Sequence, residues 1–340
     1  MTHSRGRVGR RSPCLVAVVG VVVLSLGVTS CGGGGKKQVT AGLITKQETN
    51  PFFVTMRQVA EKTASDENVK LLTAAGTSDV DNQSQVAALE DMTKRGAKGI
   101  LITPADSSAI VPAIEKARQA GVTVIALDTP TNPQSAVDAL FATDNRKAGE
   151  LIGRYARAKA AGNQITPKIA MLDLAPGITS GQLRHDGFLE GFGIADGDPA
   201  IVGSVDTEGD QAKAEAGMGQ LLKAHPDINI VYSINEPAAF GAAAAMKAAG
   251  KSNDDVILVS VDGGCHAIKD GIRSGEIDAT AQQYPENMAR KGVQALATAE
   301  RGGSKPTGYL DTGVELIAGS SVPGVASKDE AFGVRNCWGK

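Results

Sequence analysis

The stretch GILITPADSSAIVPAIEKARQAGVTVIALDTP, residues 99–130, contains one complete repeat of the fold. It opens with an aliphatic run, Gly99–Ile102, continues through a segment with helical spacing, Ala109–Gln119, and closes with a second aliphatic run, Val122–Leu127. Continuous apolar runs are typical of strands that are buried on both faces of a parallel sheet. Because a strand, a crossover helix and a second strand form a βαβ unit, this stretch predicts a parallel α/β sheet.

The same alternation of strand and helix continues on both sides of this stretch and restarts after Thr143. About 310 residues follow Cys31, which is more than one hydrophobic core usually holds, so two domains are expected. We therefore predict an α/β protein with two doubly wound parallel-sheet lobes joined by a multi-strand hinge. The predicted lobes comprise residues 39–143 with 284–310, and residues 144–283 with 311–340.

The remaining elements are predicted from the same two periodicities. The expected strands are Val39–Ile44, Val69–Ala74, Ile169–Leu172, Ile201–Val205, Ile228–Tyr232, Val256–Val261, Ile277–Ala281 and Gly313–Ile317. The expected helices are Phe52–Asp66, Gln83–Arg95, Arg146–Ala158, Leu183–Gly191, Gln211–Ala224, Ala238–Ala248 and Asn287–Arg301.

The first forty residues have the pattern of a secretory signal. Four arginines precede an apolar run, Cys14–Val28, that is too short to cross ~30 Å of hydrocarbon comfortably. The following Val28-Thr29-Ser30-Cys31 resembles a bacterial lipobox, which implies cleavage before Cys31 and a diacylglyceryl group on its sulfur. We expect a signal peptide over residues 1–30 and a lipidated, flexible tether over 31–38. An ordinary signal peptide with a chance cysteine is the alternative.

Composition and cysteine content narrow the class of protein further. The formal net charge of −2 gives no reason to expect a nucleic-acid partner. Of the four cysteines, Cys14 leaves with the signal and Cys31 is the expected lipid site, so Cys265 and Cys337 remain. A pair left in an exported domain is expected to form a disulfide, with two buried free thiols as the alternative.

Polar residues follow most of the predicted strands, at the sheet edge where open α/β sheets bind ligands. Carboxylate and amide side chains there suit hydroxyl groups, which both donate and accept, and phenyl rings can pack on C–H faces. Some of these residues can instead be helix N-caps, namely Asp106, Ser180 and Asp210. No metal-ligand spacing, G-x-S-x-G elbow or dinucleotide fingerprint is evident, so we expect no cofactor, no metal and no enzyme activity.

Several motifs recur in an order that resembles the ribose-binding-protein group of periplasmic sugar-binding proteins, which serve ABC importers. They are Thr49-Asn50-Pro51-Phe52-Phe53, Leu127-Asp128-Thr129, Ala224-His225-Pro226-Asp227, Ser260-Val261-Asp262-Gly263 and Gln282-Gln283-Tyr284-Pro285. The resemblance covers the whole mature chain and implies the type I periplasmic-binding-protein fold. GLITKQETNPFF near the start, residues 42–53, and DTGVELI with CWG near the end look closer to the fructose-binding branch.

The resemblance also implies a set of ligand contacts. They fall on Lys46, Asn50, Phe52, Phe53, Asp128, Thr129, Arg184, Asn235, Asp262 and Gln283. The chain departs from the ribose-binding pattern in three places: Thr129 stands where an arginine often follows the aspartate, and Gly209 and Val261 stand where phenylalanines occur. The thinner aromatic clamp favours a small acyclic or furanose-like ligand over an aldopyranose.

We therefore expect a lipid-anchored solute-binding protein outside the cytoplasm that closes its two lobes around the ligand. Lys46 and Arg184 offset the carboxylates of Asp128 and Asp262, which suits an uncharged sugar alcohol such as xylitol or threitol, or a ketose such as fructose. The expected partners are the ABC permease subunits and, through the lipid, the membrane, with the protein itself a monomer and no nucleic acid bound. A sugar-sensing subunit of a membrane receptor and an exported carbohydrate-active enzyme are the alternatives.

Overall fold

The computed structural model describes residues 9, 37–252 and 254–339. The predicted signal peptide, Cys31 and most of the tether lie outside these residues. The chain divides into two units, residues 1–35 and 36–340, and the second unit contains all of the elements that follow.

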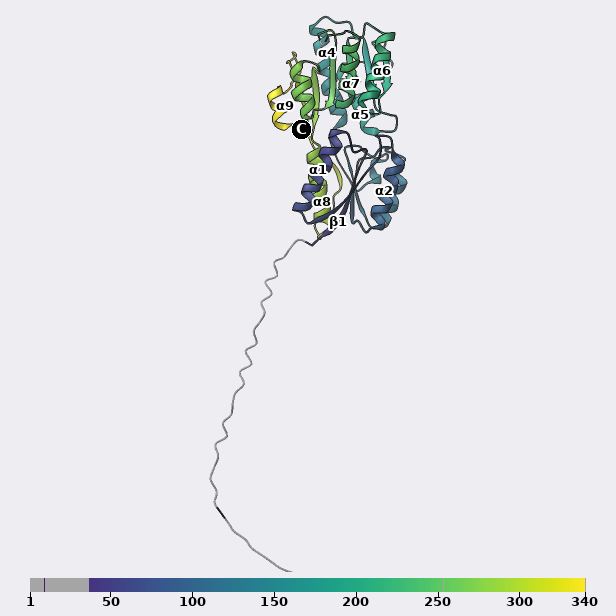
Figure 1. Cartoon of the computed structure of the whole chain (residues 1–340), viewed down its shortest axis with the longest axis vertical. Coiled ribbons are helices and arrows are strands. Elements are labelled where there is room, and N and C mark those ends of the chain that lie inside the picture. Colours follow the sequence, from purple (N-terminus) through teal and green to yellow (C-terminus); the bar gives the residue numbers. More distant parts are fainter. Residues whose placement is uncertain (1–8, 10–36, 253, 340) are drawn as a thin grey trace, which may run out of the picture. The chain divides into compact units, whose positions relative to one another are not determined.

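The first lobe is a six-stranded sheet with the strand order β11-β5-β4-β3-β1-β2 and parallel neighbours throughout. Helices α1 and α8 pack together on one face, and α2 and α3 cover the other (Figure 1). The strands are β1 (Val39–Thr45), β2 (Val69–Ala75), β3 (Gly99–Ile102), β4 (Thr123–Leu127), β5 (Ala139–Ala142) and β11 (Gly308–Asp311). The helices are α1 (Pro51–Asp66), α2 (Asn82–Lys94), α3 (Val111–Gln119) and α8 (Pro285–Glu300), with a short 3-10 turn η1 (Gln134–Ala136).

The second lobe repeats this plan with the order β12-β10-β9-β8-β6-β7, in which β12 is antiparallel to β10. Helices α4 and α5 pack together on one face, and α6 and α7 on the other. The strands are β6 (Ile169–Asp173), β7 (Ile201–Asp206), β8 (Ile230–Ser233), β9 (Ile257–Asp262), β10 (Ala279–Gln283) and β12 (Val314–Ala318). The helices are α4 (Asn145–Gly162), α5 (Thr179–Phe192), α6 (Gln211–Ala224), α7 (Glu236–Ala248), the π-helical η2 (Ala267–Ile272) and α9 (Glu330–Asn336).

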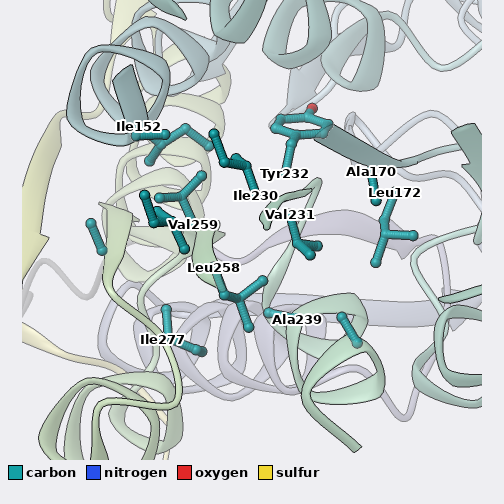
Figure 2. Packing of buried hydrophobic residues seen from close by; sticks show 14 of the residues in the cluster. Ile152, Ala170, Leu172, Ile230, Val231, Tyr232, Ala239, Leu258, Val259 and Ile277 are labelled. Carbon is teal, nitrogen blue, oxygen red and sulfur yellow. The ribbon is translucent and has the colours of Figure 1, made fainter. Parts of the chain in front are cut away.

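The sheet of the second lobe is apolar on both faces, as the continuous runs predicted. Ile230 points toward Ile152 of α4, whereas its neighbour Val231 points to the opposite face, toward Ala239 of α7 (Figure 2). Because successive side chains of a strand point to opposite faces, a sheet covered by helices on both sides needs an unbroken aliphatic run.

The chain passes between the two sheets after β5, after β10 and after β11. The prediction of two doubly wound α/β lobes with a multi-strand hinge is confirmed. Strands β5 and β11 were not predicted, because β5 follows β4 without a crossover helix and β11 is a largely exposed edge strand. Helix α9 and the π-helical η2 were also missed. No helix of the described part of the chain is long and apolar enough to cross a membrane.

Candidate functional site

A small cavity of about 20 Å³ lies between the two lobes. Its lining contains every predicted ligand residue except Thr129, together with Asp79, Leu174 and Ser180, which were not predicted as ligand residues. The complete lining is Lys46, Asn50, Phe52, Phe53, Asp79, Asp128, Leu174, Ser180, Arg184, Asn235, Asp262 and Gln283. Residues that are scattered over the sequence therefore converge on one place, as strand ends in the two sheets predict.

Two aspartates occupy equivalent places in the two lobes. Asp128 follows β4 of the first lobe directly, and Asp262 is the last residue of β9 in the second. Both have positive backbone dihedrals, with φ of 62° and 106°, a region that few non-glycine residues adopt. Strain of this kind often accompanies functional sites. The two carboxylates are thus held at the cavity by backbone conformations that cost free energy.

Arg184, on α5, joins these two carboxylates. It is 4% exposed, and its guanidinium donates to Asp128 Oδ1 at 3.5 Å and lies 3.6 Å from Asp262 Oδ1. It also donates to Asn145 Oδ1 at 2.7 Å and to the carbonyl oxygen of Ile234 at 3.1 Å. Since the guanidinium makes three hydrogen bonds and faces a carboxylate from each lobe, it has a fixed orientation between the lobes.

Glycines in the two packed helices allow α5 to place Arg184 there. A Cβ added to Gly149 of α4 would lie 2.0 Å from the carbonyl oxygen of Arg184, and one added to Gly187 of α5 would lie 2.0 Å from the carbonyl oxygen of Arg146. Contacts this short do not occur, so side chains at either position would push α4 and α5 apart. The close approach of these helices therefore sets the depth of Arg184 in the cavity.

Two asparagines that line the cavity are also helix N-caps. Asn50 Oδ1 accepts from the backbone N–H of Phe52 at the start of α1, where Pro51 occupies the first helical turn. Asn235 Oδ1 accepts from the N–H of Ala238 at the start of α7. An N-cap side chain is held by the helix it caps, so both amides have fixed positions at the cavity wall.

The aromatic wall of the cavity comes from the first lobe. The rings of Phe52 and Phe53 meet edge to face with centroids 5.4 Å apart, and the ammonium of Lys46 lies 5.9 Å from the Phe53 centroid. Lys46 Nζ also lies 3.9 Å from Asp128 Oδ2. Val261 is fully buried in the core of the second lobe instead of lining the cavity. Among the lining residues, Phe52 and Phe53 are the only aromatic ones.

Thr129 links the two lobes behind the cavity. Its hydroxyl donates to Asp128 Oδ2 at 2.8 Å and lies 2.9 Å from the hydroxyl of Ser180, which is on α5. The backbone N–H of Ser107 in the first lobe also donates to the carbonyl oxygen of Gly177 in the second. These contacts hold the two lobes against each other at this edge, which is the arrangement of a closed form.

Gln283 lies at the end of β10, where the chain enters the hinge, and it contacts Asp262. Its Nε2 donates to Asp262 Oδ1 at 2.6 Å, while its buried Oε1 has no hydrogen-bond partner among the described residues. A buried polar atom without a partner is costly, and a bound ligand is one way to satisfy it. Burial raises the pKa of Asp262, against the opposing effects of Arg184 and the hydrogen bonds it accepts.

Glu236, the first residue of α7, lies beside this group. Its carboxylate accepts from the backbone N–H of Gly264 at 2.8 Å and of Ala267 at 3.0 Å. Burial and the neighbouring charge of Asp262 raise its pKa to about 7, although the two N–H groups act in the opposite direction. Glu236 therefore supports the segment that directly follows Asp262 at the end of β9, and it titrates near neutral pH.

The C-terminal segment reaches the site from behind. Cys265 and Cys337 form a disulfide with Cα atoms 4.8 Å apart. The neighbouring Trp338 is 3% exposed, donates from Nε1 to the carbonyl oxygen of Gln283 at 2.7 Å, and packs edge to face on Phe52 with centroids 5.4 Å apart. The end of the chain thus contacts the hinge and one wall of the cavity at once.

The remaining sequence candidates have structural roles. Asp210 caps α6, and Asp106 accepts from the N–H groups of Ser108 and Ala109 ahead of α3. The described residues contain no group of three histidine, cysteine or acidic side chains that could hold a metal ion.

Comparison with known proteins agrees with the fold. The model of the periplasmic binding protein domain family matches residues 41–304. The chain belongs to this family. The ribose import binding protein of Bacillus subtilis is 32% identical over 262 residues, which are 77% of this chain and 82% of that protein. The D-allose-binding periplasmic protein of Escherichia coli is 29% identical, over 77% of this chain and 84% of that protein.

A solved structure is similar over most of the chain. It is an ABC transporter solute binding protein from Mycobacterium smegmatis with bound glycerol, with a TM-score of 0.75 and 27% sequence identity. The match covers 86% of this chain and 98% of that one. Both lobes are therefore shared with the family.

Proposed function

We propose that this chain is the lipid-anchored solute-binding protein of an ABC importer and that it captures a small uncharged carbohydrate by hinge closure. The observation that carries the proposal is the convergence of Asp128 from one lobe with Arg184 and Asp262 from the other on one cavity. A ligand that contacts both lobes stabilises the closed form relative to the open one, and this preference is what a permease can detect.

The polar groups favour a ligand rich in hydroxyls. Gln283 Oε1 offers an acceptor, the carboxylates offer others, and Lys46 and Arg184 offer donors. Only two aromatic rings line the cavity, which favours a sugar alcohol such as xylitol or threitol, or a ketose such as fructose, over a disaccharide. The names of the relatives, for ribose and D-allose, and the glycerol in the related structure support a small polyhydroxylated ligand.

The remaining parts of the proposal concern the location of the protein in the cell and its partners. We propose that Cys31 carries the lipid, that the domain works outside the cytoplasmic membrane as a monomer, and that it delivers ligand to permease subunits without chemical change. The lipobox pattern and the naming of the relatives as import and binding proteins support these points.

A thermal-shift screen tests the proposed function. The panel contains xylitol, D-threitol, D-fructose, D-ribose, D-allose, glycerol, maltose and D-gluconate. A ligand at 100 times its Kd adds about 2.7 kcal/mol of stability. We expect a polyol or ketose to stabilise the protein most. Stabilisation by maltose or gluconate alone would contradict the ligand class, and no response to any compound would contradict the proposed function.

A further inference from the structure

Asp79 is an acidic residue of the cavity that the sequence pattern did not single out. It lies in the loop between β2 and α2 and is only 3% exposed. Its Oδ1 accepts from Gln47 Nε2 at 2.7 Å. Within residues 37–252 and 254–339, no hydrogen bond is found to its Oδ2, and no cationic side chain lies within ion-pair distance of it. One oxygen of a buried carboxylate is thus without a donor.

Gly209, from the second lobe, faces this free oxygen. A Cβ added to Gly209 would lie 3.2 Å from Asp79 Oδ2, 3.0 Å from Leu174 Cδ2 and 2.7 Å from Asn235 Nδ2. Gly209 also has a φ of +69°, which disfavours other residues. The absence of a side chain at this position keeps the space in front of Asp79 Oδ2 clear, so the two lobes define one end of the cavity between them.

Asp79 also changes the charge balance of the cavity lining. Asp128 lies within 4 Å of both Lys46 and Arg184, and Asp262 lies within 4 Å of Arg184. Asp79 makes a third carboxylate against two cations. Burial raises the pKa of Asp79, although Lys46 and the hydrogen bond from Gln47 oppose this effect. A buried carboxylate needs hydrogen-bond donors, and a neutral hydroxyl can supply one.

We propose that Asp79 is a specificity-determining residue whose Oδ2 accepts a hydrogen bond from a ligand hydroxyl at the end of the cavity beside Gly209. The inference rests on the proposed function and narrows it. The site selects a neutral polyhydroxylated ligand with a hydroxyl at that end, and it discriminates against analogues that carry hydrogen, a methyl group or a carboxylate there. The extra carboxylate, and not the aromatic wall, sets this preference.

The test is a double comparison of protein variants and ligand analogues by calorimetry. The ligand is whichever of xylitol, D-fructose and D-ribose the wild-type protein binds, together with its monodeoxy analogues. In the wild type, removal of one particular hydroxyl should weaken binding 10- to 100-fold. In Asp79→Ala the parent ligand should bind 10- to 100-fold more weakly, while removal of that same hydroxyl should change Kd less than threefold. Such non-additivity identifies a direct contact.

Two further variants distinguish the effect of the Asp79 charge on binding from an effect of the substitution on folding. Asp79→Asn keeps the shape of the side chain and should bind the parent ligand about tenfold more weakly. Glu48→Gln removes an exposed carboxylate of the β1–α1 loop, outside the cavity lining, and should leave Kd unchanged within twofold. Circular dichroism and thermal unfolding without ligand check that each variant is folded, and Asp79→Asn replaces Asp79→Ala in the comparison if the latter is not.

The outcomes distinguish the two proposals. Suppose that the wild type binds one of the three compounds, and that removal of each hydroxyl weakens binding by the same factor in the wild type and in Asp79→Ala (or in Asp79→Asn, where it replaces the alanine variant). The inference about Asp79 is then overturned, and the proposed function stands. If the amino-deoxy analogue of the bound compound binds the wild type more tightly than the neutral parent, the neutral-ligand inference is overturned. If none of the three compounds binds, both the ligand class and the inference fail.

Discussion

The disulfide between Cys265 and Cys337 allows a quantitative prediction about stability. Its two residues are separated by 72 positions, so the bridge closes a large loop of the unfolded chain. By loop entropy, a closed loop of this length is worth about 4 kcal/mol at 25 °C. The double variant Cys265→Ser/Cys337→Ser should therefore lose about 4 kcal/mol of unfolding free energy. Packing of Trp338 keeps the C-terminal segment near its site, so native-state contacts should contribute little to the loss.

Urea unfolding of the chain from residue 37 onward, which contains Cys265 and Cys337 as its only cysteines, measures this difference. The oxidised wild type should show no free thiol when titrated in denaturant. A reductant should lower the unfolding midpoint of the wild type and leave that of the double variant unchanged. The double variant is therefore the control for effects of the reductant other than reduction of the disulfide. Two titratable thiols in the oxidised protein, or equal stability of the wild type and the double variant, would refute the reasoning.

Three other perturbations test separate parts of the molecule. Asp128→Ala and Asp262→Ala each leave Arg184 without one of its two carboxylate neighbours, and each should cost about 2 kcal/mol of binding, or roughly 30-fold in Kd, by calorimetry; unchanged Kd in both would move the site elsewhere. Glu236 has a pKa of about 7 in the folded protein, against 4.5 for an ordinary glutamate, so the folded state holds its proton to higher pH. Its stabilising contribution is therefore full below pH 4.5 and falls by roughly 3 kcal/mol as the pH rises to about 7. Chemical unfolding across pH 4–8 should therefore show a stability decline in the wild type that is shallower in Glu236→Gln, and equal slopes would argue against the raised pKa. Cys31→Ala should leave the protein unlipidated, released or unprocessed, which fractionation and mass spectrometry detect; lipid on the variant, or processing of the wild type at another position, would contradict the anchor.

Much of the fold could be predicted from the sequence because the helices and buried strands have strong periodic patterns. Strand β3 and helix α6 have the predicted ends, Gly99–Ile102 and Gln211–Ala224. Strands β5 and β11 could not be predicted in this way. Strand β5 follows β4 with only a short 3-10 turn between them, so the alternation of strand and helix does not indicate it, and the largely exposed β11 pairs along the edge of β5. Such pairing depends on the assembled sheet and not on the local sequence.

Site residues could be predicted from the sequence where they stand at the end of a strand. A site residue that lies further along a loop could not be predicted in this way. Asp128 and Asp262 stand at strand ends, so their place at the cavity follows from the topology. Asp79 lies four residues beyond the end of β2, close to Asp81, which caps α2. Nothing local distinguishes it from a loop residue, and only the opposing Gly209 reveals its role. Thr129 follows Asp128 in sequence, but its hydroxyl contacts the hydroxyl of Ser180 and Thr129 itself does not line the cavity.

The position of Trp338 has a practical consequence for optical measurements. It is the only tryptophan in the sequence. Its indole touches Phe52 in the cavity wall, donates to the hinge at Gln283 and lies next in sequence to the disulfide-bonded Cys337. The fluorescence of this single tryptophan therefore depends on its surroundings at the place where the cavity wall, the hinge and the C-terminal segment meet. Opening and closing of the lobes can be followed in the unlabelled protein, in real time and with a single emitting tryptophan.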